Sequence, residues 1–458
     1  MTNVRLPTAS RRVICRTNAV VNSLERTAAL QRLPPRTRLA AGVGIGVGAL
    51  SRRLGRGTGS VIGGRAILAI DPDALRRLSQ GRQVALVSGT NGKTTTTSLL
   101  AAALSRRGPV VSNALGANLP PGITAALAAA PADATHAAIE VDEAWMGTVA
   151  EATSPAVVVL LNLSRDQLDR NNEVRRLATR WRDAVHGAAA HVVANADDPL
   201  VAWAAMAAAS VTWVGAGQRW TADAAGCPNC GGRINFPDEL GGDWACQNCH
   251  LRRPPLDVWL EGGDIVIRES GERLAVQLAL PGRCNQANAA MAMEAAHRLG
   301  VGRSEALAAM AATSEVAGRY RTVTVEGTCA RLLLAKNHAG WLETFDLLSP
   351  PPTPVVVAIN ARIADGKDPS WLWDVPFEKL QGRLVVATGE RSADLAVRLG
   401  YADVEHLRQP DPVEAIVAAG RAAGGATVDV VANYTSFQAI TGRLATTERL
   451  AGTGRHDA

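Results

Sequence analysis

The chain has 458 residues, enough for about two to four domains, and 47% of its residues are hydrophobic, which is ordinary for a globular protein. Its formal net charge of +6 is mild for this length, and no run reaches the roughly 18 apolar residues that a transmembrane helix needs. These numbers exclude a membrane-spanning protein, and we expect a cytoplasmic protein without a signal peptide.

The first part of the chain is rich in arginine. Residues 1–65 hold twelve arginines against a single acid, Glu25. We assign residues 1–55 to an Arg-rich N-terminal extension, which is either a partly disordered leader or a segment that touches anionic lipid headgroups or nucleic acid. Its stretch AAGVGIGVGAL (40–50) is too short to span a bilayer, and we expect it to form a close-packed turn of helix.

The stretch VALVSGTNGKTTTTSLL (84–100) combines an apolar strand, a glycine turn and a helix. Such a turn presents backbone N–H groups and the positive end of a helix dipole to an anion. A lysine at position 93 would reach terminal phosphates, and the hydroxyl of Thr94 would bind Mg²⁺. The sequence therefore predicts an ATP-binding loop whose contacts come from Thr90, Asn91, Gly92, Lys93, Thr94 and Thr95.

Apolar strand-like runs alternate with Ala/Leu helical patterns from about residue 60 onward, which predicts a parallel sheet covered by helices on both faces. The first set of expected strands is 84–88, 137–141, 156–162, 191–194 and 211–214. After SPPPTP (349–354), further strands are expected at 355–360, 383–388 and 427–432. We therefore predict an α/β protein with a central nucleotide-binding domain over 56–319 and a C-terminal α/β domain over 320–458.

A Gly/Cys/Pro-rich insertion at 222–253 interrupts the central domain, and antiparallel strands after it return to the host domain. The insertion has the form C-x2-C-x15-C-x2-C, which supplies four thiolates to one structural Zn²⁺. The predicted ligands are Cys227, Cys230, Cys246 and Cys249. Acids outnumber basic residues in this zinc ribbon, which argues against nucleic-acid binding, and Trp244 is expected in its small core.

The loop SGTNGKTTT resembles the TGTNGKT loop of the Mur ligases and folylpolyglutamate synthases. Those enzymes use ATP to phosphorylate a carboxylate before an amine displaces the phosphate. IEVDEA (139–144) resembles the strand whose acid binds Mg²⁺, which implies Glu140, with Asp142 or Glu143 as weaker candidates. LLNLSRDQLDR (160–170) resembles the family's Asn-x-x-x-Asp-His-Leu-Asp segment, with Gln167 in place of His.

Two further stretches carry the same resemblance. PGRCNQANAAMA (281–292) is similar to the family's adenine-site helix, which implies that Asn288 reads the base. VAGRYRTV (316–323) implies that Arg319 reaches the γ-phosphate. Together with Lys93 and the Mg²⁺ ion, Arg319 would neutralise the charge that develops when a carboxylate attacks ATP.

Lysine usage departs from several amino-acid-adding members of the family, which hold a second Mg²⁺ with a carbamylated lysine. The chain has four lysines, and none lies between Lys93 and Lys336. A carbamyl-lysine in this domain is therefore impossible, and a second metal would need other ligands.

Stretches of the C-terminal domain resemble one branch of the family, the Mur-ligase-like subunits of lipid II isoglutaminyl synthases. The matching stretches are LLLAKNHAGWLET (332–344), VVVAINARIADGKDPSWLWDVPFE (355–378) and VVANYTSF (430–437). This resemblance implies ATP-dependent amidation of the α-carboxylate of D-glutamate in the lipid II stem peptide, giving D-isoglutamine.

No cysteine of the chain sits in a convincing nucleophile context, so a partner should supply the glutaminase. The resemblance implies that this partner is a GatD-type class I glutamine amidotransferase that forms a heterodimer with this chain. The resemblance implies that an Asp crosses the interface to orient the partner's histidine. Asp368 is the first choice, Asp365 follows closely, and Asp374 is the third acid of the stretch. Two alternatives stay open at this stage: a self-sufficient Mur or folylpolyglutamate-type amino acid ligase, and a zinc-ribbon nucleic-acid ATPase.

Overall fold

The computed structural model describes residues 33–453, except for the short segments 56–58, 114–116, 132, 166–173, 239–241 and 314–319, and it describes side chains up to residue 444. Arg319 and Gln167 lie outside the described residues, as does the first part of the Arg-rich extension. The nucleotide loop, the four ribbon cysteines and the three candidate acids of the C-terminal domain all lie inside them.

The central domain is built on one large, mostly parallel sheet. Within the described ranges this sheet has nine strands in the order β11-β10-β9-β6-β5-β4-β1-β3-β2. Its parallel part consists of β1 (Gln83–Ser88), β2 (Val110–Ser112), β3 (His136–Glu140), β4 (Val157–Leu160), β5 (His191–Asn195), β6 (Val211–Gly215) and β9 (Val258–Glu261). Antiparallel strands β10 (Asp264–Ile267) and β11 (Arg273–Ala275) close one edge.

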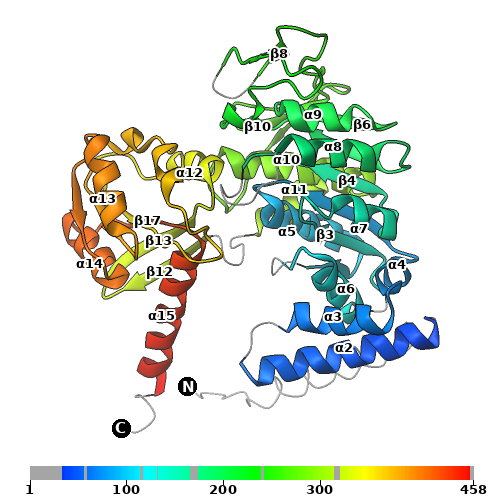
Figure 1. Cartoon of the computed structure of the whole chain (residues 1–458), viewed down its shortest axis with the longest axis horizontal. Helices are drawn as coiled ribbons and strands as arrows, with labels where there is room; N and C mark the ends of the chain where they lie inside the picture. Colours follow the sequence, from blue (N-terminus) through cyan, green and yellow to red (C-terminus); the bar gives the residue numbers. More distant parts are fainter. Residues whose placement is uncertain are drawn as a thin grey trace, which may run out of the picture.

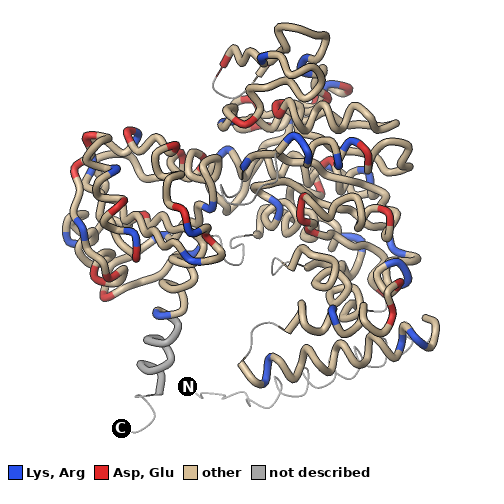
Figure 2. The backbone as a smooth tube through the Cα atoms, in the orientation of Figure 1, with Lys and Arg blue, Asp and Glu red and all other residues tan. Residues whose placement is uncertain are grey.

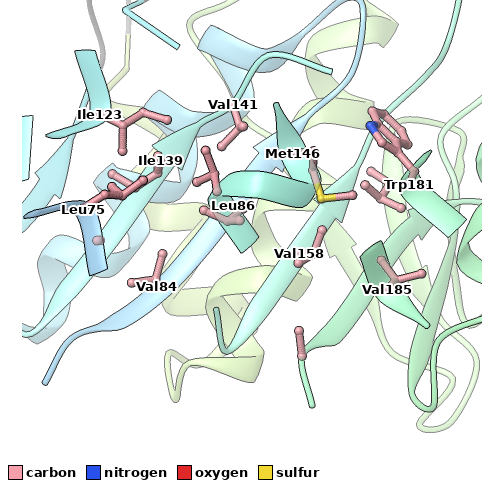
Figure 3. Close-up of a cluster of buried hydrophobic side chains, with 14 of the residues drawn as sticks. Leu75, Val84, Leu86, Ile123, Ile139, Val141, Met146, Val158, Trp181 and Val185 are labelled. Carbon is pink, nitrogen blue, oxygen red and sulfur yellow. The ribbon is translucent and has the colours of Figure 1, made fainter. Parts of the chain in front are cut away.

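Helices cover both faces of this sheet (Figure 1). Alternate residues of β1 point to opposite faces, so Val84 and Leu86 enter one core while Ala85 and Val87 enter the other. Figure 3 shows the first core, in which Leu86 lies near Ile139 and Trp181 lies toward the other end of the cluster. The helices on this face are α2 (Pro35–Arg53), α3 (Ser60–Ile70), α4 (Ala74–Ser79), α6 (Pro120–Ala129), α7 (Met146–Thr153), α8 (Val174–Val185) and α9 (Pro199–Ala205). The opposite face carries α5 (Lys93–Leu104), α10 (Arg283–Arg298) and α11 (Arg303–Ala311).

The cysteine-rich segment lies between β6 and β9 and contains a small hairpin of β7 (Ile234–Asn235) and β8 (Ala245–Cys246). Because Gly215 of β6 pairs with Trp259 of β9, the sheet resumes where the insertion left it. The Trp244 side chain is fully buried, and its Nε1 donates to the Ala196 carbonyl of the host domain at 2.9 Å. The expectation that Trp244 belongs to a core is therefore correct, and this core is shared with the host.

The C-terminal domain has its own sheet. In the part of the chain that the structure covers, this sheet has six strands in the order β12-β13-β17-β14-β15-β16. They are β12 (Tyr320–Val325), β13 (Thr328–Leu334), β14 (Val355–Ala358), β15 (Val385–Thr388), β16 (His406–Arg408) and β17 (Val428–Ala432). All neighbours are parallel except β12 and β13. The surrounding elements are α12 (His338–Phe345), α13 (Ser392–Tyr401), α14 (Pro412–Ala422), α15 (Tyr434–Thr453) and the 3-10 turns η3 (Ser370–Trp373) and η4 (Phe377–Leu380).

Helices α2 and α3 form a pair whose contact depends on glycine. A Cβ added at Gly44 would lie 2.2 Å from the Ile67 side chain and 2.7 Å from the Gly63 carbonyl oxygen. The glycine-rich stretch 40–50 thus forms a helix that packs closely on α3, as expected. Among the described residues, no helix is both long enough and apolar enough to cross a membrane.

Candidate active site

The glycine turn after β1 has the backbone geometry of an anion-binding loop. Gly92 is the N-cap of α5 and has φ of 82°, in the left-handed region that favours glycine. A Cβ at this position would lie 2.6 Å from Asn288 Oδ1, so Gly92 is required by space as well as by conformation. The turn thus brings the N-terminus of α5 directly against the α10 residue that the family resemblance assigns to adenine.

The two residues predicted to bind Mg²⁺ lie in contact. Thr94 Oγ1 donates a hydrogen bond to Glu140 Oε2 at 2.8 Å, and both side chains are buried. Asn118 Nδ2 donates to the other carboxylate oxygen at 3.1 Å. Asn113 fixes the Glu140 backbone through two hydrogen bonds of 2.8 Å each, one to its N–H and one to its carbonyl. The result is a cluster of oxygen ligands of the type that Mg²⁺ prefers.

Lys93 is buried beside this cluster and pairs with an acid. Its Nζ lies 3.1 Å from Glu143 Oε1 and also donates to the carbonyl groups of Gly89 and Thr90. Glu143, a weaker Mg²⁺ candidate in the sequence, is thus a partner of the loop lysine. The ammonium is therefore held against the glycine turn, beside the predicted phosphate site.

Asn162 holds the nucleotide loop in shape, a role that the sequence reading did not assign. Its Oδ1 accepts from the Asn91 backbone N–H at 2.9 Å, and its Nδ2 donates to the Asn91 carbonyl at 3.1 Å. Its own carbonyl accepts from the Thr90 N–H at 2.9 Å. The Thr90 hydroxyl and Ser164 backbone complete the clamp with bonds of 3.0 and 3.1 Å. The only advance signal was that Asn162 lies in the family-like stretch 160–170.

An open cavity begins at this loop and extends to the C-terminal domain. The central domain contributes Asn91, Gly92 and Thr95 from the loop, with Cys284 and Asn288 from α10. The opposite wall includes residues from β12, β13, α12 and the loop between β13 and α12, namely Tyr320, Leu333, Lys336, Gly340 and Glu343. The structure therefore brings the predicted phosphate loop and Asn288 to one cavity. It also places Lys336 and Glu343 there, which the sequence did not assign to the site.

Electrostatics in this cavity follow from burial. Burial raises the pKa of Glu343, with the nearby Asp346 carboxylate acting in the same direction. Burial likewise raises the pKa of the Cys284 thiol to about 12, so this thiol is protonated at neutral pH. Cys284 is thus a poor nucleophile, in line with the expectation that no cysteine of the chain sits in a nucleophile context.

A stack of aromatic rings joins the two domains next to the cavity. His338, at the start of α12, stacks on Trp220 of the central domain with ring centroids 5.2 Å apart, and it meets the edge of Trp371 at 6.2 Å. Its Nε2 lies 3.3 Å from Asp374 Oδ2. Burial lowers the pKa of His338, which favours the neutral imidazole. Asp374, the third candidate acid, therefore belongs to this domain contact.

The two leading acids of the C-terminal domain have different surroundings. Asp365 is buried. Its carboxylate accepts hydrogen bonds from the Thr435 backbone N–H, at 2.9 Å, and from the Thr435 hydroxyl, so it holds the start of α15. Asp368 is exposed, and its Oδ1 accepts a local bond from the Ser370 N–H at 2.9 Å. That bond lowers the pKa of Asp368 and keeps it ionised. The geometry favours Asp368 over Asp365 as an acid that reaches another molecule.

The four ribbon cysteines converge on one point. Cys227 and Cys249 have sulfur atoms 3.7 Å apart, Cys230 and Cys246 have sulfur atoms 3.5 Å apart, and all four lie within 4.8 Å of one another. Sulfurs placed about 2.3 Å from a tetrahedral Zn²⁺ are roughly 3.8 Å from each other. The donor set therefore fits one zinc ion with no open position. His250 is exposed and lies outside this group.

The loop also fits ATP and Mg²⁺ in its donor chemistry. Within the described chain, the Asn91 side-chain Nδ2 is buried and has no hydrogen-bond partner, so the cavity retains an unused donor beside Gly92. Thr94 and Glu140 supply hard oxygen ligands, as Mg²⁺ requires. The role of Arg319 stays a prediction, because this residue is outside the described residues.

Comparisons with known proteins agree with this arrangement. Residues 87–232 match the Mur ligase middle domain family, and residues 334–437 match the MurT ligase C-terminal family. The chain is 29% identical to the lipid II isoglutaminyl synthase (glutamine-hydrolyzing) subunit MurT of Staphylococcus aureus over 379 residues, which cover 78% of this chain and 85% of the relative.

A second relative and a solved structure extend the similarity. The MurT subunit of Streptococcus pneumoniae is 29% identical over 374 residues, covering 76% of this chain and 83% of that protein. In fold, the chain is similar to a pseudomurein peptide ligase type C from Methanothermus fervidus, with a TM-score of 0.60, 20% sequence identity, and coverage of 77% of this chain and 76% of that chain.

Proposed function

We propose that this chain, which matches the Mur ligase middle domain family over residues 87–232 and the MurT ligase C-terminal family over residues 334–437, is the ATP-dependent, carboxylate-activating subunit of a lipid II isoglutaminyl synthase. Its substrate is then the α-carboxylate of D-glutamate in the lipid II stem peptide, and the product is D-isoglutamine. The observation that carries the proposal is the cavity in which a Mur-type nucleotide loop faces a wall supplied by a MurT-like C-terminal domain.

The chemistry proceeds in two displacements. A carboxylate oxygen of the substrate attacks the γ-phosphorus of ATP, and the bond from that phosphorus to the bridging oxygen of ADP breaks. Ammonia then attacks the carbonyl carbon of the acyl-phosphate, the carbon–oxygen bond to phosphate breaks, and the nitrogen releases a proton. One oxygen of the original carboxylate therefore leaves in inorganic phosphate.

The residues of the loop have distinct tasks in the first displacement. The backbone N–H group of Gly92 and the dipole of α5 hold the phosphates, and Lys93 offsets charge on the transferred group. Thr94 and Glu140 would hold Mg²⁺, which supplies further charge neutralisation when it is bound. Arg319 is proposed to meet the γ-phosphate from the segment that joins the two domains.

The nitrogen is proposed to come from a GatD-type class I glutamine amidotransferase. Of the six cysteines within the described residues, four surround the zinc position and Cys284 carries a thiol whose pKa is raised to about 12. The last, Cys329, is half-buried in β13. A glutaminase needs an activated thiolate, so we propose that the partner provides it and that Asp368 orients the partner's histidine.

A surface near Asp368 has the character of a protein-binding site. Trp373 is 54% exposed and Tyr401 is 77% exposed, and their rings meet edge to face with centroids 5.3 Å apart. Ile363 and Val397 are also exposed. Exposed aromatic residues of this kind are typical anchors at protein interfaces, so we place the glutaminase contact here. The heterodimer would work in the cytoplasm, at the inner face of the membrane that carries lipid II.

Isotope transfer tests the central step. With ¹⁸O in both oxygens of the substrate carboxylate, one label per turnover should appear in released phosphate. Absence of label in phosphate, despite amide formation, would exclude the acyl-phosphate route. Incorporation of a free amino acid in place of ammonia would instead support a self-sufficient amino acid ligase.

The source of nitrogen is tested with two variants of the heterodimer. Asp368→Asn should lose glutamine-dependent amidation by at least about tenfold while keeping the rate with ammonium chloride, because only the partner's site depends on this acid. Asp365→Asn should lower the melting temperature, because it removes the carboxylate that holds α15. Equal loss of both activities in a well-folded Asp368→Asn protein would assign Asp368 to this chain's own chemistry.

A further inference from the structure

The outward face of α2 carries an exposed apolar strip. The strip contains Leu39 and Leu50, which are 63% and 58% exposed, and Leu54 at the C-terminal end of the helix, which is 60% exposed. Val43, between Leu39 and Leu50, is also exposed. In an α-helix each residue turns by about 100°, so positions 39, 43, 46, 50 and 54 fall within a sector of about 80°. The buried residues of α2, among them Ala40, Gly44 and Gly48, occupy the opposite side, against α3.

Helix α3 widens this strip at one end. The Gly59 carbonyl lies against Gly48, because a Cβ at Gly48 would be 3.0 Å from that oxygen. The start of α3 is therefore beside the second half of α2, where Val61 and Ile62 are both exposed. We call the exposed apolar side chains of α2 and α3 (Leu39, Val43, Leu50, Leu54, Val61 and Ile62) the α2–α3 face.

The charged residues of α2 and α3 themselves are of one sign. Residues 33–70 contain no Asp or Glu, while five exposed arginines lie on the two helices: Arg36, Arg38, Arg52, Arg53 and Arg65. Figure 2 shows blue segments along α2, at the lower edge of the molecule. On the helical wheel Arg36 and Arg53 border the apolar sector. An apolar strip bordered by arginine is the pattern of a helix that lies flat in the interface of an anionic bilayer.

Packing contacts and a hydrogen bond link the α2–α3 face to the candidate active site. Gly64 of α3 packs on the start of α6, where an added Cβ would lie 1.7 Å from the Pro121 carbonyl oxygen. Asn118, shortly before α6, donates to Glu140 Oε1 at 3.1 Å. A surface bound to α2 and α3 would therefore lie at a fixed position relative to Glu140 and Thr94.

We propose that the α2–α3 face docks on an anionic lipid surface, with its leucines among the acyl chains and its arginines against the phosphates of the headgroups. The idea deepens the proposed function, since it explains how a chain with no spanning helix among its described residues reaches a lipid-linked substrate. Two other occupants, residues 1–32 of the same chain and a second copy of the protein, are outcomes that the test separates.

Vesicle sedimentation of the full chain tests the surface without any substrate. Wild type should bind vesicles of phosphatidylglycerol and phosphatidylcholine in equal parts, and bind pure phosphatidylcholine vesicles far less. The double variant Leu39→Asn/Leu50→Asn should lower binding to the anionic vesicles by at least about tenfold. A matched control, Met206→Asn/Leu407→Asn, removes two exposed apolar side chains elsewhere and should bind as wild type does.

Three results would overturn the proposal. If wild type does not bind anionic vesicles, the proposal is excluded. If the leucine variant binds them as well as wild type does, the proposal is also excluded, and residues 1–32 become the candidate lipid-binding segment. Conversion of a wild-type dimer to a monomer by the leucine variant, seen by light scattering, would assign the face to a second copy.

Activity of the heterodimer separates this proposal from the proposed function. The leucine variant should amidate lipid II in vesicles more slowly, but amidate a water-soluble stem-peptide analogue at the wild-type rate. Failure of wild type on both substrates would refute the proposed function and leave the vesicle result standing.

Discussion

Replacing Asn162 with alanine should weaken ATP binding without unfolding the protein. The change removes the two side-chain hydrogen bonds to Asn91 at 2.9 and 3.1 Å. Each bond contributes about 1 kcal/mol net, and the stranded Asn91 N–H adds desolvation cost, so the nucleotide-ready loop loses about 2–3 kcal/mol. Since 1.4 kcal/mol corresponds to a factor of ten in affinity, we expect the Kd for ATP to rise about 30- to 100-fold.

Calorimetric titration with a non-hydrolysable ATP analogue measures this effect, and thermal unfolding checks the fold. The matched control is Asn235→Ala, on the exposed side of the ribbon hairpin, which should leave the Kd unchanged. If the Asn162→Ala protein melts as wild type does and binds the analogue within threefold of the wild-type Kd, then the clamp does not prepare the loop, and the reasoning is wrong.

Three further changes test other parts of the structure. Gly92→Ala should weaken ATP binding at least about tenfold, whereas Gly81→Ala, with a similar positive φ but open space around it, should lower only stability, by about 1 kcal/mol. Burial lowers the pKa of His191 to about 4, so stability present above pH 6.5 is lost as pH falls toward 4. Urea unfolding at pH 7 and pH 5 measures the effect. Between these two pH values the free energy of unfolding should fall by about 1 kcal/mol more in wild type than in His191→Gln, after discounting for partial exposure. Cys246→Ser should lose bound zinc in elemental analysis, while Cys329→Ser keeps one equivalent; full zinc in the first variant would contradict the ligand assignment.

The sequence predicted the alternation of strands and helices well because the parallel strands are buried on both faces and read as unbroken apolar runs. The expected strand 84–88 corresponds to β1 at Gln83–Ser88, and the expected strand 355–360 corresponds to β14 at Val355–Ala358. The α/β class and the cysteine cluster are confirmed for the same kind of reason, since both depend on short-range spacing.

Side-chain contacts between segments that are distant in the sequence could not be predicted from residue spacing. Nothing local marks Asn162 as the partner of Asn91, 71 positions earlier, and nothing in the C-terminal stretches shows that Lys336 faces the nucleotide loop. The sequence ranked Asp368 first and Asp365 close behind, but it could not show what either carboxylate contacts. Only the fold reveals that Thr435 uses one of them.

The ribbon shares a hydrophobic core with the central domain, so the stability of the ribbon affects the packing of that domain. Trp244 sits among ribbon residues and also donates to the carbonyl of Ala196, which directly follows a strand of the central sheet. Loss of a zinc ion held by the four cysteines would therefore disturb more than the ribbon, because it would also loosen the packing of Trp244 against the domain that carries the candidate active site.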